Sequence, residues 1–99
     1  MPLDRALAGH TFWRRLKRPK VFHDTTHADR RRQERNLSLE QMQDVVVNHE
    51  QQIQHRRGEH GGFVYEFIRR VEKTKLTVIA DLKHTECWLI TGWVEQNEN

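Results

Sequence analysis

The segment Leu37-Ser38-Leu39-Glu40-Gln41-Met42 decides the architecture, because it carries the signals of a helix start. Ser38 is a favoured N-cap residue, and Gln41 stands three positions later, as a capping box requires. Leu37 and Met42 occupy the two positions of a hydrophobic staple. The segment therefore predicts a helix over residues 39–49. The apolar residues that recur at helical spacing and form its predicted buried face are Leu39, Met42, Val45 and Val46.

Upstream of this start, the sequence predicts a short strand or extended segment and then another helix. Residues 21–25 have the extended pattern. Thr26 suits an N-cap with Asp29 at the third helical position, which predicts a helix over residues 27–35. Asn36 suits the end of that helix, because asparagine tolerates the left-handed backbone conformation found there.

Downstream, the apolar period changes from helical to alternating. The alternation predicts strands at about residues 53–56, 63–70, 76–82 and 87–94, with a glycine-containing turn at 58–62. The last of them is apolar at nearly every position, which is typical of a central strand. Helices come first and strands follow, so the predicted fold class is α+β. We expect two N-terminal helices packed on a three- to five-stranded antiparallel sheet.

Composition indicates one small, polar-surfaced domain. The chain has 99 residues, of which 35% are hydrophobic and 31% charged. No apolar run approaches the ~20 residues that span a bilayer. The single cysteine, Cys87, excludes an internal disulfide framework and fits a reducing compartment. Residues 1–36 carry a net charge of +6 and residues 37–99 a net charge of −3. Such a basic half favours a polyanion or an acidic protein as partner.

Residues 1–20 form a basic N-terminal arm ahead of a domain at residues 21–96. A cationic cluster ends at Pro19, which disfavours helix at the residue before it. The cluster comprises Arg14, Arg15, Lys17 and Arg18. It is either a set of RNA-phosphate contacts or a solubilising terminus. Phe12 and Trp13 favour an arm that is ordered and docks on the core.

The predicted helix over 27–35 would place His27, Arg31 and Arg35 on one face, at positions i, i+4 and i+8. An imidazole moves protons near neutral pH, and guanidinium groups bind phosphate in a bidentate manner. These are the groups that cleavage of a phosphodiester bond needs. The alternative is a solvated charged helix face, with the arginines paired to acidic residues such as Glu86.

Metal-free RNA cleavage fits these residues best, because the RNA 2′-hydroxyl is itself the nucleophile. The seven histidines lack the spacing of a zinc motif, and no glycine-rich phosphate loop is present. Thr91 on the last strand could add a hydroxyl to the same phosphate. Tyr65 and Trp93 could stack on bases. The alternative is that Thr91 is an ordinary strand residue and that Tyr65 and Trp93 are aromatic residues of the core.

The pattern His27-Ala28-x-x-Arg31-x-x-x-Arg35-Asn36-Leu37-Ser38 resembles a motif of small bacterial toxin-like domains, His-Ala-x-x-Arg-x-x-x-Arg-Gly-Ile-Ser. Those domains are grouped with the barnase/EndoU/colicin/RelE-like (BECR) ribonuclease fold. Their apolar last strand with a threonine is similar to Trp88-Leu89-Ile90-Thr91-Gly92-Trp93. The resemblance covers about residues 22–95. Asn36 and Leu37 replace the glycine and isoleucine of the motif.

The resemblance implies a metal-independent endoribonuclease toxin without a cofactor. Its catalytic positions would be His27, Arg31, Arg35 and Thr91, and its substrate tRNA or mRNA. It would come from a toxin–antitoxin pair or a contact-dependent inhibition system. It would act in the bacterial cytoplasm, made there or delivered as a secreted effector, and bind an acidic antitoxin or immunity protein. Two alternatives stay open: a non-enzymatic nucleic-acid-binding module, and an interaction domain for an acidic protein.

Overall fold

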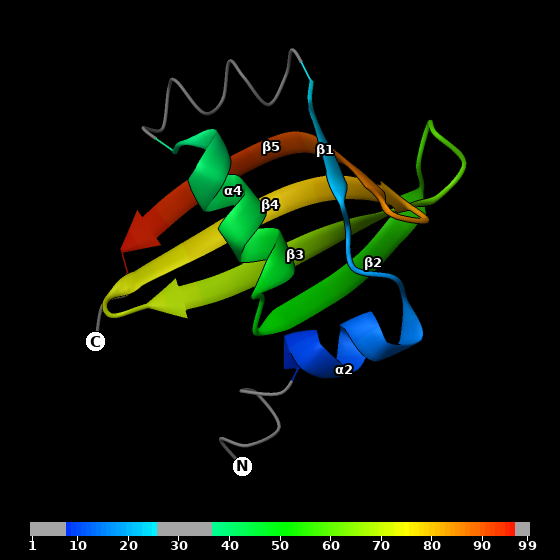
Figure 1. The fold of residues 1–99 in the computed structure, drawn as a ribbon. Helices are drawn as coiled ribbons and strands as arrows, with labels where there is room; N and C mark the ends of the chain where they lie inside the picture. Colours follow the sequence, from blue (N-terminus) through cyan, green and yellow to red (C-terminus); the bar gives the residue numbers. More distant parts are fainter. Residues whose placement is uncertain (1–7, 26–36, 97–99) are drawn as a thin grey trace.

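In the computed structural model of the chain, two helices lie on one face of a five-stranded sheet (Figure 1). The structure describes residues 8–25 and 37–96. The helix expected over 27–35, with His27, Arg31 and Arg35, lies outside these residues. The elements are α2 (Ala8–Arg15), β1 (Val21–Asp24), α4 (Leu39–Val47), β2 (Gln51–Arg57), β3 (Phe63–Val71), β4 (Thr74–Lys83) and β5 (Glu86–Gln96). The α+β class is therefore confirmed.

Helix α4 begins as the sequence predicts. The backbone N–H of Gln41 donates to Ser38 Oγ at 3.0 Å, and the N–H of Ser38 donates to Gln41 Oε1 at 2.8 Å. The capping box is therefore complete. The helix ends at Val47, two residues before the expected end, and Asn48 is its C-cap. The buried side chains of the helix are Met42, Val45 and Val46.

Strands β2 to β5 form an antiparallel meander, and β1 joins it as a parallel strand. The expectation of a purely antiparallel sheet is therefore wrong. Consecutive strands joined by tight turns must run antiparallel. Strand β1 is not joined to its neighbour in this way, because Val21 pairs with Glu86 at the other end of the sequence. The sheet order is β1-β5-β4-β3-β2, so β5 has a neighbour on each side, as its apolar sequence predicts.

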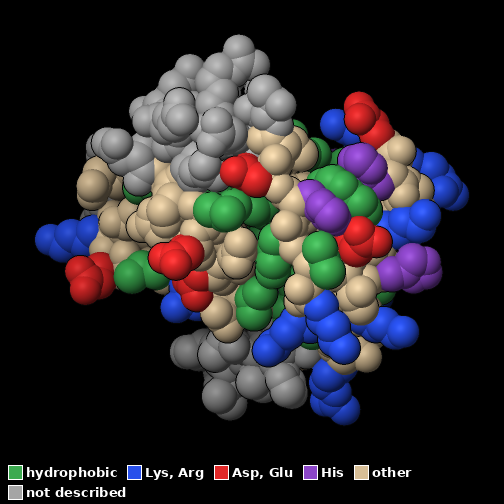
Figure 2. Space-filling model, turned by 45° about the horizontal axis from the view of Figure 1, so that its top comes forward, with side chains coloured by type: hydrophobic (Ala, Val, Ile, Leu, Met, Phe, Trp, Pro, Cys, Tyr) green, Lys and Arg blue, Asp and Glu red, His purple; other side chains and the backbone are tan. Residues whose placement is uncertain are grey.

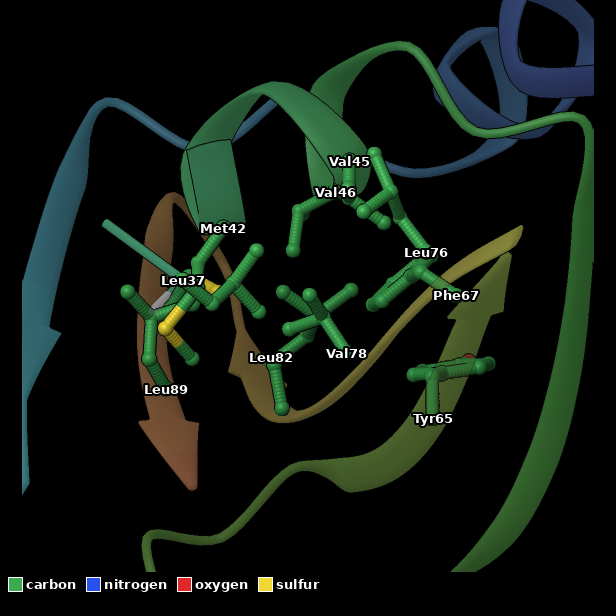
Figure 3. Close-up of a cluster of buried hydrophobic side chains, with 12 residues drawn as sticks. Leu37, Met42, Val45, Val46, Tyr65, Phe67, Leu76, Val78, Leu82 and Leu89 are labelled. Carbon is green, nitrogen blue, oxygen red and sulfur yellow. The ribbon is translucent and has the colours of Figure 1, made fainter. Parts of the chain in front are cut away.

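The hydrophobic core lies between the sheet and the helices (Figure 3). Strand alternation places Phe67, Val78 and Leu89 on the sheet face that α4 covers, and all three are fully buried. Leu37, just before the helix, is also fully buried and belongs to the same cluster. Tyr65, on β3, lies at the periphery of the cluster and is 8% exposed.

Helix α2 occupies residues that the sequence assigned only to a basic arm. Its Phe12 and Trp13 pack against the core, so the prediction that these rings dock the arm is confirmed. The indole N–H of Trp13 donates to the Val47 carbonyl at the end of α4, at 2.8 Å. The helix itself was not predicted, because Gly9 disfavours helix and the segment has only eight residues. Contact with the core supplies the missing stability.

The opposite face of the sheet is covered by neither of the two described helices. It carries Trp88, Thr91 and Trp93 of β5, which pair across to Asp81, Ile79 and Thr77 of β4. A bulge in β5 between the partners of Ile79 and Ala80 adds one residue, Ile90, to this strand. Ile68, Thr77 and Asp81 on this second face are nevertheless buried.

Candidate nucleic-acid interface

Basic side chains gather where the β2–β3 and β4–β5 turns lie together, at one end of the sheet. The register places both turns at this end, because Leu82 pairs with both Phe63 and Cys87. The segment after α2 arrives at the same end, where the Lys20 N–H donates to the Thr85 carbonyl at 2.7 Å. Figure 2 shows Lys, Arg and His side chains gathered on one side of the visible surface.

A cleft of about 350 Å³ opens at this end, on the sheet face that carries the helices. Its basic side chains come from two distant parts of the chain: Arg15 ends α2 and Lys17 follows it, whereas Lys83 ends β4 and His84 begins the β4–β5 turn. Phe63 and Tyr65 of β3 also line it. We call these six residues the basic cleft. Cations around aromatic rings are the combination that binds phosphates and stacks bases.

The two aromatic residues of the basic cleft are held in place by polar groups. The guanidinium carbon of Arg57 lies 5.2 Å from the centre of the Phe63 ring. The Tyr65 hydroxyl donates to Gln54 Oε1 at 3.4 Å. Burial raises the pKa of the Tyr65 phenol, and the positive charge of Arg15 partly offsets this rise. The phenol therefore stays neutral at physiological pH and can donate a hydrogen bond.

Two glycines allow the β2–β3 turn to lie close to β4. Gly61 has φ +92°, a conformation that residues with a side chain rarely adopt. A Cβ on Gly62 would lie 1.6 Å from the carbonyl oxygen of Leu82. Both glycines border the cleft, so this close approach shapes its wall.

A second pocket, of about 230 Å³, lies at the same end of the sheet on the opposite face. Trp88 is sandwiched there between two histidines. The His60 ring stacks on it at a centroid distance of 4.0 Å and an angle of 6°, and His23 stacks at 4.8 Å and 14°. His23 Nε2 and Glu86 Oε1 are 2.9 Å apart, which fixes the orientation of that ring.

The carboxyl group of Asp81 also lines this second pocket, and the residue is only 2% exposed. The backbone N–H of His60 donates to Asp81 Oδ2 at 3.3 Å. The carboxyl group packs against Gly58, where an added Cβ would lie 2.1 Å from Oδ2. Among the described residues, Asp81 Oδ1 has no hydrogen-bond partner although it is buried.

The structure brings together some of the predicted RNA-binding residues and separates others. Arg15, Lys17 and Tyr65 meet in the basic cleft. Arg14 and Arg18 are exposed on the same segment but do not line the cleft. Trp93 lies on the opposite sheet face, and its indole N–H donates to Glu95 at 3.0 Å, so it does not join the cleft. Thr91 is half-buried on that same face, beside Ile79 of β4.

Several residues at this end of the sheet were not singled out by the sequence. Lys83 ends β4 and His84 begins the turn after it, and the sequence does not indicate what these side chains face. Trp88 was interpreted only as an apolar residue of the last strand. Asp81 was missed because the alternation of β4 assigns it to the polar side, although it is buried. A charged residue inside an otherwise apolar strand was the available signal.

The described residues offer little to metal or thiol chemistry. They contain no group of three or more His, Cys, Asp or Glu side chains placed to hold a metal ion. Cys87 is fully buried, and burial raises the pKa of its thiol, so it is not a nucleophile. Neither described helix has the length and apolar character needed to cross a bilayer.

Comparison with known proteins gives no relative from which to transfer a function. No protein-family model, curated protein or solved structure matches this chain.

Proposed function

We propose that this protein binds RNA at the basic cleft and cleaves it as a metal-independent endoribonuclease. The observation that carries the proposal is the convergence of Arg15, Lys17, Lys83 and His84 around two aromatic rings. The positive charges of Arg15, Lys17 and Lys83 repel one another, and an RNA phosphate backbone would neutralise them. Exposed bases can stack on Phe63 or Tyr65 while the phosphates contact the cations.

Cleavage itself is proposed on the sequence motif. His27 would either accept the proton of the attacking 2′-hydroxyl or donate a proton to the leaving 5′-oxygen, and Arg31 and Arg35 would hold the phosphate. Thr91 would add its hydroxyl from β5. Thr25, two residues before His27, is fixed to this strand, because its hydroxyl donates to the Leu89 carbonyl at 2.8 Å. Thr91 follows Leu89 by two residues on β5.

The biological setting is proposed on the same motif. The protein would be a bacterial toxin with the BECR ribonuclease fold, acting on tRNA or mRNA in the cytoplasm. An acidic antitoxin or immunity protein would neutralise it by covering the basic cleft. Electrostatic complementarity with this cleft is the physical reason for expecting an acidic partner.

The test has a cleavage arm and a binding arm. Total RNA and tRNA are incubated with the purified protein in EDTA, with His27→Ala beside the wild type. The wild type is expected to cleave, and the variant to bind RNA without cleaving it. His55→Ala is the matched control, because His55 is an exposed histidine on β2 and lines neither pocket. Intact RNA at micromolar wild-type protein would refute the enzymatic proposal.

The binding arm uses a fluorescent 12-nucleotide uridine RNA. The double variant Arg15→Ala/Lys17→Ala is expected to weaken binding and to lower the dependence on salt by about 1.4 in log–log slope, for two phosphate contacts on a single strand. Lys73→Ala/Lys75→Ala removes the same charge at the opposite end of the sheet, and should bind like the wild type. Equal losses in both double variants would show that net charge, and not the cleft, binds RNA.

A non-enzymatic nucleic-acid-binding module remains the second candidate. One observation favours it: the cations and aromatic rings of the basic cleft are the groups that RNA binding needs, and binding requires no group that transfers a proton. Binding that depends on Arg15 and Lys17, without cleavage in any condition, would select this candidate over the first.

A further inference from the structure

The second pocket, built around Asp81 and the Trp88 stack, has no role in the proposal above. Its residues come from all five strands or the segments next to them, and include Asp81, His60, Trp88 and Ile90. Trp88 and Ile90 give the pocket apolar walls, and the charged residues Arg56 and Glu59 also line it. It combines a flat aromatic surface with few polar groups, as small-molecule sites do.

Asp81 is the feature of the pocket that most requires a ligand. A buried polar atom without a hydrogen bond costs about 1–3 kcal/mol, and more when it is charged. Oδ1 of Asp81 is such an atom, whereas Oδ2 accepts from the His60 backbone. A carboxylate is an acceptor only, so the missing partner must be an N–H or O–H donor. A ligand that brings donors to this site removes the cost.

The aromatic stack leaves one ring surface for that ligand. Both faces of Trp88 are covered, one by His23 and the other by His60. His60 is exposed and lines the pocket, so the outer face of its imidazole is available for a further flat ring. Histidine is one of the side chains on which unstacked RNA bases stack. The ligand is therefore expected to be planar as well as rich in N–H donors.

The two pockets are close enough in the fold to serve one RNA strand. Gly61 and Gly62 line the basic cleft, and Glu59 and His60 line the second pocket, so the β2–β3 turn separates them. Lys83 of the cleft and Asp81 of the pocket are two residues apart on β4. A strand whose phosphates contact the cleft can therefore turn a base around this end of the sheet.

We infer that the second pocket is a nucleobase subsite with guanine as its preferred base. Guanine presents two neighbouring N–H donors, at N1 and at the N2 amino group, and a carboxylate can accept both. Adenine and cytosine present one amino group, and uracil a single ring N–H. This inference rests on the proposed RNA binding. It also places the selected base beside Ile90, the residue before Thr91, so selection would act near the proposed cleavage site.

The experiment compares two 12-nucleotide RNAs of uridine that carry one central guanosine or one central inosine. Inosine lacks only the N2 amino group. We expect the wild type to bind the guanosine RNA about tenfold more tightly, because a hydrogen bond to a charged group is involved. Asp81→Asn keeps an acceptor for the His60 N–H and replaces the other oxygen by a donor. It is expected to bring the ratio near one, with unchanged affinity for the all-uridine RNA.

Asp44→Asn is the matched control, since it makes the same change at an exposed acid of α4 and should keep the wild-type ratio. A ratio near one in the wild type, or a ratio that Asp81→Asn leaves unchanged, would overturn the inference. If Asp81→Asn does not fold, His60→Ala is used in its place, because it removes the stacking ring and leaves the backbone donor to Asp81. Failure of the proposed function is recognised separately, as no binding of the all-uridine RNA.

Discussion

Replacing Phe12 by alanine should both destabilise the protein and weaken RNA binding. The Phe12 ring lies edge-on to four others, with centroid distances of 4.7 Å to Trp13, 5.1 Å to His49, 5.2 Å to Tyr65 and 5.9 Å to Phe67. Truncation of a fully buried phenylalanine costs about 3–5 kcal/mol. Phe12 is partly buried, so we expect a loss of about 2–3 kcal/mol in the free energy of unfolding.

The functional consequence follows from what α2 carries. Arg15 is the last residue of this helix, and Phe12 is one turn earlier on it. Loss of the ring should let α2 leave the sheet and withdraw Arg15 and Lys17 from the basic cleft. We expect the RNA affinity of Phe12→Ala to fall about as far as that of Arg15→Ala/Lys17→Ala, although every cation is still present.

Urea unfolding followed by circular dichroism measures the first effect, and anisotropy of the labelled uridine RNA the second. Thr11→Ala changes the neighbouring exposed residue of α2 and should cost less than about 0.5 kcal/mol. Phe12→Ala with a stability within 0.5 kcal/mol of the wild type would refute the packing of α2. Normal RNA affinity in a destabilised Phe12→Ala would refute the dependence of the cleft on α2.

Three further predictions concern single residues. Burial lowers the pKa of His49, so protonation favours the unfolded chain, and the free energy of unfolding should fall as the pH drops below about 6.5. In a plot of urea midpoint against pH, His49→Gln should flatten this part of the curve, and an unchanged slope would contradict the assignment to His49. Ser38→Ala removes the cap of α4 and should cost about 1 kcal/mol in urea unfolding, whereas Ser38→Asp, another good N-cap, should cost less. Gly62→Ala directs a Cβ at the Leu82 carbonyl and should cost about 3 kcal/mol, and a variant as stable as the wild type would show that the turn can move away from β4.

Local patterns in the sequence predicted the parts of the fold that depend on neighbours in the chain. The Ser38 cap, the start of α4 and the positions of β3, β4 and β5 rest on patterns within a few residues, and the structure confirms them. Burial does not alternate along β3 and β4, because residues of both sheet faces are buried. The parallel pairing of β1 with β5 was not predicted, because the two strands are at opposite ends of the sequence. Helix α2 was not predicted, because its sequence has a weak helix propensity and the contacts of Phe12 and Trp13 with the core stabilise it.

The candidate sites were predictable in composition but not in arrangement. The basic front half and the aromatic residues indicated RNA, and Arg15, Lys17 and Tyr65 do share a cleft. No local pattern indicates that Lys83 lies in the same cleft. Its position there depends on the register of β4 and on the path of the chain after α2. Asp81 was not singled out, and its burial involves His60 and Gly58 of the β2–β3 turn, which is distant in the sequence. The catalytic assignment of His27, Arg31, Arg35 and Thr91 stays a prediction.

The pairing of β1 with β5 also constrains the order in which the protein folds. Thr25 and Leu89, bonded at the end of this pair, are 64 residues apart in the chain. Closing a loop of that length costs about 3 kcal/mol more entropy than closing a two-residue hairpin. The meander of β2 to β5 can therefore assemble first, and β1 joins last. During synthesis β1 leaves the ribosome early yet stays unpaired until β5 has been made, and until then one edge of the sheet has no neighbour to protect it from another chain.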